Sequence, residues 1–324
     1  MSRKDEHVQL ALKQAVSTND FDKMRLVHHS LGAVDIDSID YQTTLGSLNL
    51  QHPFYINAMT GGSDFTKKIN RDLAMVAKET GLMMAVGSMS AVFRDPTSLD
   101  SFKIVREMNP QGLVLANLNL NYSLEQATQA ISIIDADGIQ FHLNSPQEIT
   151  MPEGDRHFEH WPQRIQQMNT LKTTVIIKEV GFGMSAKTIQ QLIDLNTKII
   201  DVSGKGGTNF IEIESARHQH QYDYLSQWGQ STLESLLHAQ PFLDQATIMA
   251  SGGIRHPLDV VKSLVLGAKA VGVSKVFLTS IMNHGVNETI QMILQWQRDI
   301  KYLMALVGAR NLKELKNVDY LLNL

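Results

Sequence analysis

Side chains with acid, base and amide chemistry are crowded together directly after an apolar, β-prone run at 138–143. Imidazole, amide and carboxylate groups bind phosphate oxygens, hold metal ions and move protons, so their close spacing indicates the edge of an active site. The alternative is a solvated loop after a core strand, because polar residues dominate surface connections. In chain order the side chains are His142, Asn144, Gln147, Glu148, Glu153 and Asp155.

A regular framework must position these groups, and from Pro53 onward short apolar runs alternate with amphipathic segments. Eight such repeats predict an α/β fold, a (β/α)8 TIM barrel with buried parallel strands. A doubly wound sheet is the alternative, but no GxGxxG follows the first strand. The predicted strands are 54–59, 83–88, 113–118, 138–143, 174–180, 198–204, 246–253 and 270–275. The predicted helices are 67–80, 98–108, 124–134, 161–171, 186–195, one from about 232 after a long loop, 257–266 and 288–306.

The first 52 residues precede the barrel. They predict a helix at 5–16 and a hairpin within 36–53, which together resemble a cap on one end of the barrel. We predict one domain over 1–324, with 1–52 as the N-terminal cap and 53–324 as the barrel with its C-terminal helix.

Composition narrows the class of protein. Hydrophobic residues make up 43% of the chain, enough for a large core, and the net charge of −4 gives no basic footprint for nucleic acid. There is no cysteine, so disulfides, thiolate metal sites and cysteine nucleophiles are excluded. Without an apolar signal segment or membrane span, we expect a cytoplasmic protein with no membrane or nucleic-acid partner.

Glycine and small hydroxyl residues recur at the predicted strand exits, where barrel active sites lie. Backbone N–H groups of such loops bind phosphate, although each glycine alone could simply serve a tight turn. Lys178, late in the apolar strand TVIIKEV, suits either a reduced flavin or a buried bridge to a neighbouring glutamate. In the flavin case, Met59 and Thr60 would face the ring edge near N5. The phosphate-site candidates are Gly252, Gly253, Gly272, Ser203, Ser251, Ser274 and the SGKGGT loop from Ser203 to Thr208.

Together these segments resemble the type 2 isopentenyl-diphosphate isomerases over nearly the whole chain. The motifs are RKDEH (3–7), NAMTGG (57–62), HLNSPQE with PEGD, KEVGFG (178–183), SGKGGT, WGQST (228–232) and ASGGIR (250–255). HLNSPQE–PEGD with KEVGFG is highly specific, whereas the glycine loops also occur in 2-hydroxy acid oxidases.

The resemblance implies an enzyme that interconverts isopentenyl and dimethylallyl diphosphate, using reduced FMN, Mg²⁺ and NADPH or NADH as reductant. It implies that the N-terminal arm closes over the prenyl diphosphate substrate, and that Glu148 binds the metal. It also implies a homotetramer or larger oligomer, which Trp296 on the last helix and the apolar surface of the barrel's outer helices would permit. The implied substrate residues are Arg3, Lys4, His7, His142, Asn144 and Gln147, of which Gln147 and His142 are the candidate catalytic residues. The implied FMN residues are Ala58, Met59, Thr60, Ser88, Asn117, Lys178, Ser203, Thr208, Gly252, Gly253, Arg255, Val273 and Ser274.

The implied chemistry moves a double bond by adding a proton at one carbon and removing one from another. Alkenes are weak bases, and few acidic side chains stand where the prenyl group should lie. The flavin N5 region could fill that role, and an amide such as Gln147 would then position the substrate or relay a proton.

The chain departs from the family pattern at several exits. Met89 and Ser90 stand where Gln and Arg are common, and Arg94 cannot be assumed to replace that arginine. Asn119 replaces a glycine, and Gln230 and Ser231 replace Ile and Pro. Two other functions stay open: a 2-hydroxy acid dehydrogenase built on the adjacent Arg255 and His256, and a phosphate-ligand sensor without catalysis.

Overall fold

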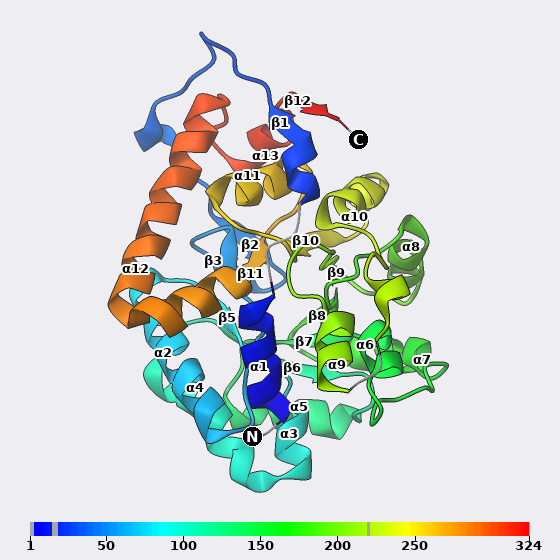
Figure 1. Ribbon diagram of the computed structural model, residues 1–324. Helices are drawn as coiled ribbons and strands as arrows, with labels where there is room; N and C mark the ends of the chain where they lie inside the picture. Colours follow the sequence, from blue (N-terminus) through cyan, green and yellow to red (C-terminus); the bar gives the residue numbers. More distant parts are fainter. Residues whose placement is uncertain (1–2, 15–18, 219–220, 324) are drawn as a thin grey trace.

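The computed structural model describes residues 3–14, 19–218 and 221–323 (Figure 1). Its centre is a closed parallel barrel in the strand order β10-β11-β4-β5-β6-β7-β8-β9, which confirms the predicted TIM barrel. All eight predicted strands are present, most of them shorter than predicted. They are β4 (Phe54–Ile56), β5 (Met84–Ala85), β6 (Val114–Asn119), β7 (Gly138–Leu143), β8 (Thr174–Glu179), β9 (Ile199–Asp201), β10 (Thr247–Ser251) and β11 (Val271–Val273).

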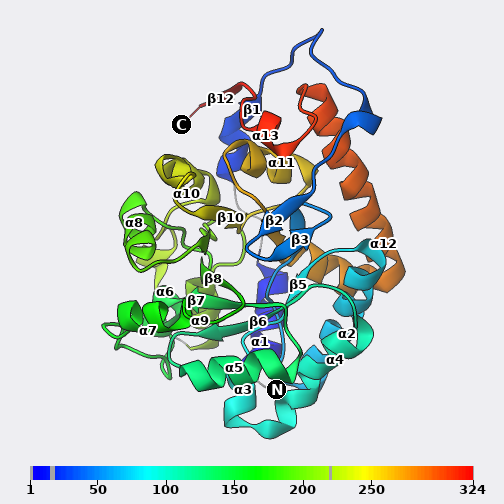
Figure 2. The same cartoon turned by 180° about the vertical axis from the view of Figure 1, so that it is seen from behind.

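Helices surround the barrel, and Figure 2 shows the same ring from behind. Their starts follow from capping chemistry: Ser63, Ser123 and Ser231 each accept a backbone N–H three residues on, and the side chain there bonds back. Within the described residues no helix has the length and hydropathy to cross a membrane. The predicted helices correspond to α1 (Arg3–Lys13), α2 (Asp64–Thr80), α4 (Asp100–Met108), α5 (Leu124–Ile133), α7 (Trp161–Met168), α8 (Ala186–Asp194), α10 (Thr232–Ala239), α11 (Pro257–Val265) and α12 (Lys275–Leu306). The last two residues predicted for the first helix, 15 and 16, lie outside the described residues.

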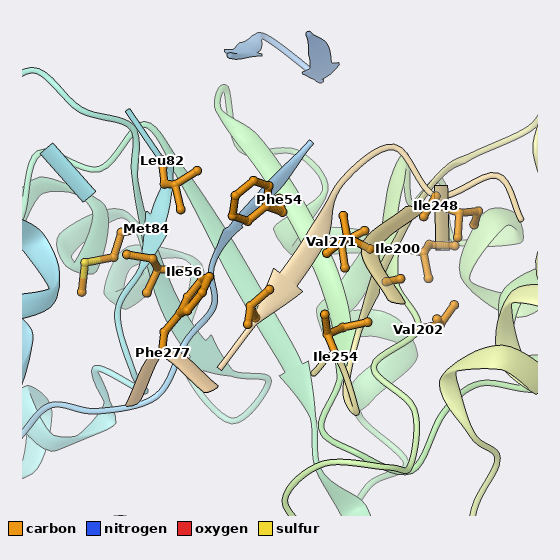
Figure 3. Close-up of a cluster of buried hydrophobic side chains, with 14 of the residues drawn as sticks. Phe54, Ile56, Leu82, Met84, Ile200, Val202, Ile248, Ile254, Val271 and Phe277 are labelled. Atoms are coloured by element: carbon orange, nitrogen blue, oxygen red, sulfur yellow. The ribbon is translucent and has the colours of Figure 1, made fainter. Parts of the chain in front are cut away.

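Trp296 lies in the core between the strands and the helices, so its side chain cannot contact another subunit. Trp296 is only 6% exposed, and its ring lies 6.2 Å from that of Phe54 and 5.4 Å from that of Phe277. Figure 3 shows Phe54 and Phe277 among the neighbouring aliphatic side chains of this core. Trp296 is therefore turned toward the core, and the suggestion that this side chain offers an oligomer surface is wrong.

The predicted hairpin closes the N-terminal end of the barrel. β2 (Thr43–Leu45) pairs with β3 (Leu48–Leu50) in antiparallel register. Leu45 and Leu48 pack on Ile176 and Ile199, which face the barrel interior, and Ser47 bonds the Thr174 hydroxyl at 3.0 Å. This end is thus plugged, and the opposite end remains for the site.

Several elements were not predicted. Two of them, α6 (Ser145–Thr150) and α9 (Phe210–Arg217), lie in segments read as loops, and those readings are wrong. Strand β1 (Met24–Leu26) pairs with β12 (Tyr320–Leu322), so a short strand of the N-terminal cap lies beside the C-terminal strand. The others are α3 (Ser90–Arg94), α13 (Leu312–Leu315) and the 3₁₀ turns η1 (Asp20–Lys23), η2 (Ile36–Ser38), η3 (Pro96–Leu99), η4 (Asp223–Leu225) and η5 (Gln240–Phe242).

Candidate active site

A cavity of about 770 Å³ opens at the C-terminal ends of the barrel strands, and residues of α1 line part of its wall. Its volume is in the upper part of the range usual for ligand sites. Every predicted site residue except Val273 lines this one cavity. Val273 is fully buried in the core, and its carbonyl accepts the Asn57 N–H at 3.0 Å.

Lys178 lies on the barrel axis side of β8, among groups that are almost all buried. Its Nζ donates to the Glu179 carbonyl at 2.7 Å. Burial lowers the pKa of Lys178, while the carboxylates of Asp201 and Glu179 act in the opposite direction. Burial also raises the pKa of Glu179 to about 8. Both readings of Lys178 therefore retain support: it neighbours carboxylates, and its cation also lines the cavity.

His142 and Asn117 form a fixed pair across β7 and β6. The Nδ1 of His142 lies 2.8 Å from Asn117 Oδ1, and Asn117 Nδ2 donates to Gln140 Oε1 at 3.3 Å. With that amide orientation, Nδ1 carries the proton and Nε2 is left as an acceptor. Burial, with Lys178 and Lys4 nearby, lowers the pKa of His142 to about 3, so the ring is neutral at physiological pH. A bound anion would offset the two lysines and draw this pKa upward.

Helix α6 gathers three predicted residues at one edge of the cavity. Asn144 Nδ2 donates to Glu148 Oε1 at 2.9 Å, and the Asp155 N–H donates to Glu148 Oε2, also at 2.9 Å. The Oδ1 of Asn144 is buried and has no hydrogen-bond partner. Buried polar atoms are almost always paired, so this orphan acceptor indicates a place for a ligand or ion.

Glu148 is the one member of this group with a carboxylate suited to a metal. Among the residues that the structure describes, no three His, Cys, Asp or Glu side chains are grouped to hold an ion. A Mg²⁺ ion here would thus take one protein carboxylate and complete its shell with phosphate oxygens and water, which is a common arrangement for this ion.

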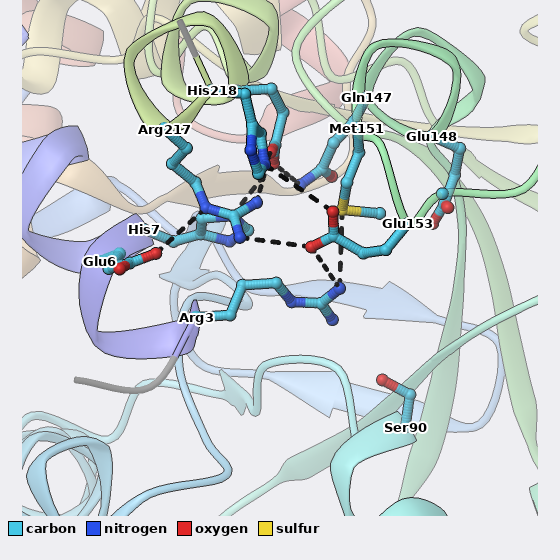
Figure 4. Close-up of polar contacts among 12 residues, drawn as sticks. Arg3, Glu6, His7, Ser90, Gln147, Glu148, Met151, Glu153, Arg217 and His218 are labelled. Carbon is cyan, nitrogen blue, oxygen red and sulfur yellow. Dashed lines mark hydrogen bonds and ion pairs between the residues drawn. The ribbon is translucent and has the colours of Figure 1, made fainter.

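Gln147 is oriented by Glu214, a fully buried carboxylate on α9. Gln147 Nε2 donates to Glu214 Oε1 at 3.3 Å, and His7 Nε2 lies 3.0 Å from the same oxygen. Arg217 donates to Glu214 Oε2 at 2.5 Å. Figure 4 shows Gln147, His7 and Arg217 pointing toward one another, with His218 beside them.

Ion pairs attach α1 to this edge of the site. Arg217 also donates to Glu6 and to Glu153, each at 3.2 Å, and Arg3 lies 3.6 Å from Glu153. Figure 4 shows Arg217 between these two carboxylates. The helix that carries Arg3 and His7 is therefore fastened over the cavity by charge.

Lys4 projects from α1 into a positively charged corner. Burial, followed by the nearby Arg3 and Arg94, lowers the pKa of Lys4 to about 8. Lys4 thus remains mostly protonated at neutral pH, and an anion in this corner would relieve the repulsion among the cations.

The glycine loops after β9 and β10 touch each other closely. A Cβ at Gly207 would meet the Gly253 nitrogen at 3.0 Å, and one at Gly253 would meet Gly206 backbone carbon atoms at 3.0 and 3.1 Å. Ser203 has a positive φ of 33°, which turns the chain from β9 into this loop. The loops leave a backbone-lined part of the cavity with Thr208, Gly252 and Ser274, where Ser274 precedes the first turn of α12. Such backbone surfaces suit phosphate.

The first two strand exits are rigid. Thr60 donates from Oγ1 to Asn70 Oδ1 at 2.7 Å, and the Ala58 N–H donates to Asn57 Oδ1 at 2.8 Å. Gly87 allows the second exit to approach: a Cβ there would lie 2.5 Å from the Thr60 carbonyl oxygen. The part of the cavity wall formed by these two exits is therefore held in place. Its residues are Ala58, Met59, Thr60 and Ser88.

Arg255 lines the cavity, but its guanidinium is engaged elsewhere. It donates to Asp22 at 2.6 and 2.9 Å and to Asp259 at 2.9 and 3.1 Å. Neighbouring His256 is half exposed and caps α11. Asn19 Nδ2 donates to the Gly253 carbonyl, so this segment holds the glycine loop in place. Arg255 serves mainly to fasten η1 to α11.

Sequence reasoning missed Glu214 and Arg217, because α9 was read as loop. A signal was present: Asn209 accepts the N–H groups of Ile211 and Glu212, and an Asn with Glu three residues on is typical of a helix start. A similar signal, Asn144 followed by Ser-Pro, precedes α6.

Comparisons with known proteins agree with this geometry. A family model described as FMN-dependent dehydrogenase matches residues 118–321. The chain is 46% identical over 324 residues to the isopentenyl-diphosphate delta-isomerase of Staphylococcus epidermidis, covering 99% of this chain and 93% of the relative. It is 49% identical over 325 residues to that of Latilactobacillus sakei, covering 99% of this chain and 93% of the relative.

Among solved structures, a flavocytochrome b2 mutant with pyruvate bound aligns with a TM-score of 0.72 at 17% identity, covering 97% of this chain and 82% of the other. A mandelate oxidase mutant aligns with a TM-score of 0.69 at 16% identity, covering 98% and 92%. At such identity the likeness shows the fold alone. The sequence relatives and the family model decide the assignment: the chain belongs to the FMN-dependent, type 2 family of isopentenyl-diphosphate delta-isomerases.

Proposed function

We propose that this enzyme interconverts isopentenyl diphosphate and dimethylallyl diphosphate with reduced FMN and Mg²⁺. The observation that carries the proposal is one cavity in which a backbone-lined phosphate cradle and Lys178 accompany an edge built from Asn144, Gln147 and Glu148. This arrangement has room for a flavin and a small prenyl diphosphate together.

The residues present fit FMN. The close approach of Gly207 and Gly253 leaves N–H groups for its phosphate, and Lys178 supplies a buried cation suited to a reduced ring. When bound, reduced FMN would supply an electron-rich ring and a proton donor and acceptor near the prenyl carbons. The other residues proposed to hold it are Ala58, Met59, Thr60, Ser88, Asn117, Ser203, Thr208, Gly252 and Ser274. Val273 could contact FMN only through its backbone. Arg255 could contact FMN only if its hydrogen bonds to Asp22 and Asp259 were broken.

The diphosphate would lie between α1 and α6. Arg3 and Lys4 supply positive charge, His7 and His142 supply ring nitrogens, and Asn144 can turn its amide to a phosphate oxygen or a metal-bound water. Glu148 would hold Mg²⁺ beside the diphosphate, because this ion prefers a carboxylate together with phosphate oxygens. The ion would also offset the charge that Glu148 brings near the anion.

Gln147 would act on the prenyl end. Its Nε2 is directed at Glu214, so its orientation is fixed before substrate enters. An amide is a poor acid and a poor base, so Gln147 would position the alkene or pass a proton along rather than generate one. His142 is neutral in the empty site, and it would bind phosphate best after the anion has raised its pKa.

Further parts of the proposal rest on the family resemblance. NADPH or NADH would reduce the flavin, and the protein would act in the cytoplasm as a homotetramer or larger oligomer. The chain would form one domain, in which residues 1–52 include the arm that closes over the substrate. The ion pairs between α1 and α9 are consistent with such an arm.

A 2-hydroxy acid dehydrogenase is the second candidate, because the family model that matches residues 118–321 is described as FMN-dependent dehydrogenase. That chemistry needs a histidine base and an arginine free to bind a carboxylate. In this chain Arg255 is bound to two aspartates and His256 caps α11, so neither is available as placed.

One anaerobic assay tests these functions. Protein with FMN, Mg²⁺, isopentenyl diphosphate and NADPH or dithionite should form dimethylallyl diphosphate, detected by NMR or mass spectrometry. Absence of product under these conditions would refute the proposal. Reduction of the flavin by lactate or mandelate, without a requirement for Mg²⁺, would favour the dehydrogenase, and binding without any turnover would favour the sensor.

A further inference from the structure

Arg94 lies at the cavity mouth with its guanidinium held by hydrogen bonds to one neighbouring residue. Its Nε donates to the Ser90 carbonyl at 3.3 Å, and its Nη2 donates to Ser90 Oγ at 3.1 Å. Ser88 Oγ donates to the same Ser90 hydroxyl at 3.1 Å. Because Ser90 Oγ accepts both bonds, its own proton is free to point into the cavity, which Ser90 also lines.

Arg94 differs from the other arginines near the cavity in its ion pairs. Arg217 meets three carboxylates, and Arg255 meets two. In the described part of the chain no carboxylate forms an ion pair with Arg94, although the residue lines the cavity. Arg217 and Arg255, which fasten elements of the fold, are thus paired with carboxylates, whereas Arg94 has no such ion pair.

Two cations of α1 lie near Arg94. Arg3 and Arg94 both lower the pKa of Lys4, after burial, which places the three positive groups within electrostatic reach. The repulsion between like charges grows as water is excluded. Three cations close together therefore destabilise the protein when no anion is bound. A site that binds a highly charged anion gains from this arrangement, because the anion removes the repulsion.

We propose that Arg94, together with the Ser90 hydroxyl, binds the diphosphate of the substrate from the α3 side of the cavity. This inference rests on the proposed function and names a further substrate-binding residue for it. A guanidinium offers two parallel N–H donors to phosphate oxygens, and Nη1 together with the second N–H of Nη2 can provide them while the bonds to Ser90 remain. Glu148 would engage the same diphosphate through the metal from the α6 side.

The test measures binding of inorganic pyrophosphate, with Mg²⁺, to the FMN-loaded protein by calorimetry, beside the KM for isopentenyl diphosphate. Arg94→Gln should raise both the pyrophosphate Kd and the KM about tenfold, a value kept modest because Arg94 is exposed. The kcat and the FMN Kd should each change less than twofold. Arg94→Lys, which keeps the charge but loses the fork, should lose about threefold. Arg298→Gln, an equal charge change on the exposed face of α12, is the matched control and should change nothing.

A pyrophosphate Kd for Arg94→Gln within twofold of wild type would overturn the inference. The same holds if Arg298→Gln weakens binding equally, since only general charge would then matter. The outcome for the proposed function is read separately, from product formation by the wild-type enzyme. If wild type binds pyrophosphate, Arg94→Gln does not, and neither forms product, the anion site stands and the isomerase proposal falls. If wild type binds no pyrophosphate, the inference about Arg94 falls, and the isomerase proposal still stands or falls on product formation alone.

Discussion

Replacing Arg217 by Met tests whether the ion-pair network in Figure 4 holds α1 over the site. The Arg217 side chain is 9% exposed and the Glu214 side chain is fully buried. The substitution therefore leaves a buried carboxylate with His7, Gln147 and His218 beside it. Removing one partner of a buried ion pair costs about 3–5 kcal/mol, and the neutral side chains around Glu214 replace little of the lost charge. The pairs of Arg217 with Glu6 and Glu153 add little to stability, because both carboxylates are about 40% exposed. We therefore expect the unfolding free energy to fall by the lower end of this range, about 3 kcal/mol.

The assay is thermal unfolding, followed by kinetics on the folded variant. An unfolding entropy of about 2.1 cal/mol/K per residue gives ~0.7 kcal/mol/K for a 324-residue chain, so Tm should fall by about 4 °C. KM should also rise, because Glu6 and Arg217 fasten the helix that carries Arg3 and Lys4.

Arg71→Met is the control, because it removes an exposed pair with Asp72, and its Tm should stay within about 1 °C. A Tm for Arg217→Met that matches the control, with an unchanged KM, would refute the reasoning: the network would then contribute neither to stability nor to the closed position of α1.

Three further predictions concern individual site residues. Glu148→Gln should abolish the activation by Mg²⁺ and lower kcat/KM by at least ~100-fold while FMN still binds. Glu107→Gln, on the exposed face of α4, is the control. Loss of FMN from Glu148→Gln would show that Glu148 has another role. Lys178→Met should raise the FMN Kd at least ~10-fold, because a buried charged donor is lost, and a Kd within threefold of wild type in a fluorescence titration would contradict this. The pKa of Lys4 is lowered to about 8, so the cation is present below that pH and lost above it; log kcat/KM should therefore fall above pH 8, and Lys4→Arg should remove the decline.

The barrel could be predicted from the sequence because its signals are local. Each strand is an apolar run of a few residues, and the strand exits carry glycine, such as Gly252 and Gly253. In a parallel barrel all exits meet at one end, so the topology itself converts eight separate motifs into one site. The strand pattern therefore suffices to predict that Lys178, His142 and Glu148 share one cavity, and all three line it.

The side-chain network could not be predicted in the same way. Arg217 meets Glu6 and Glu153, which are 211 and 64 positions away in the chain, and no local pattern announces such pairs. Arg94 was a similar case: only the turn of helix α3 shows that residues 90 and 94 share one face. The error over Trp296 has the reverse cause, since an amphipathic helix pattern does not tell which body the apolar face covers.

The closure of the barrel between β4 and β11 has a consequence for how this chain is made. Ile56 pairs with Val273, so β4 lacks its second neighbour until nearly the entire barrel has left the ribosome. During synthesis the nascent chain carries an open strand edge, and unpaired edges are where chains add to one another. Truncation before β11 would therefore leave two such edges, at β4 and β10, and should yield aggregates in place of a smaller enzyme.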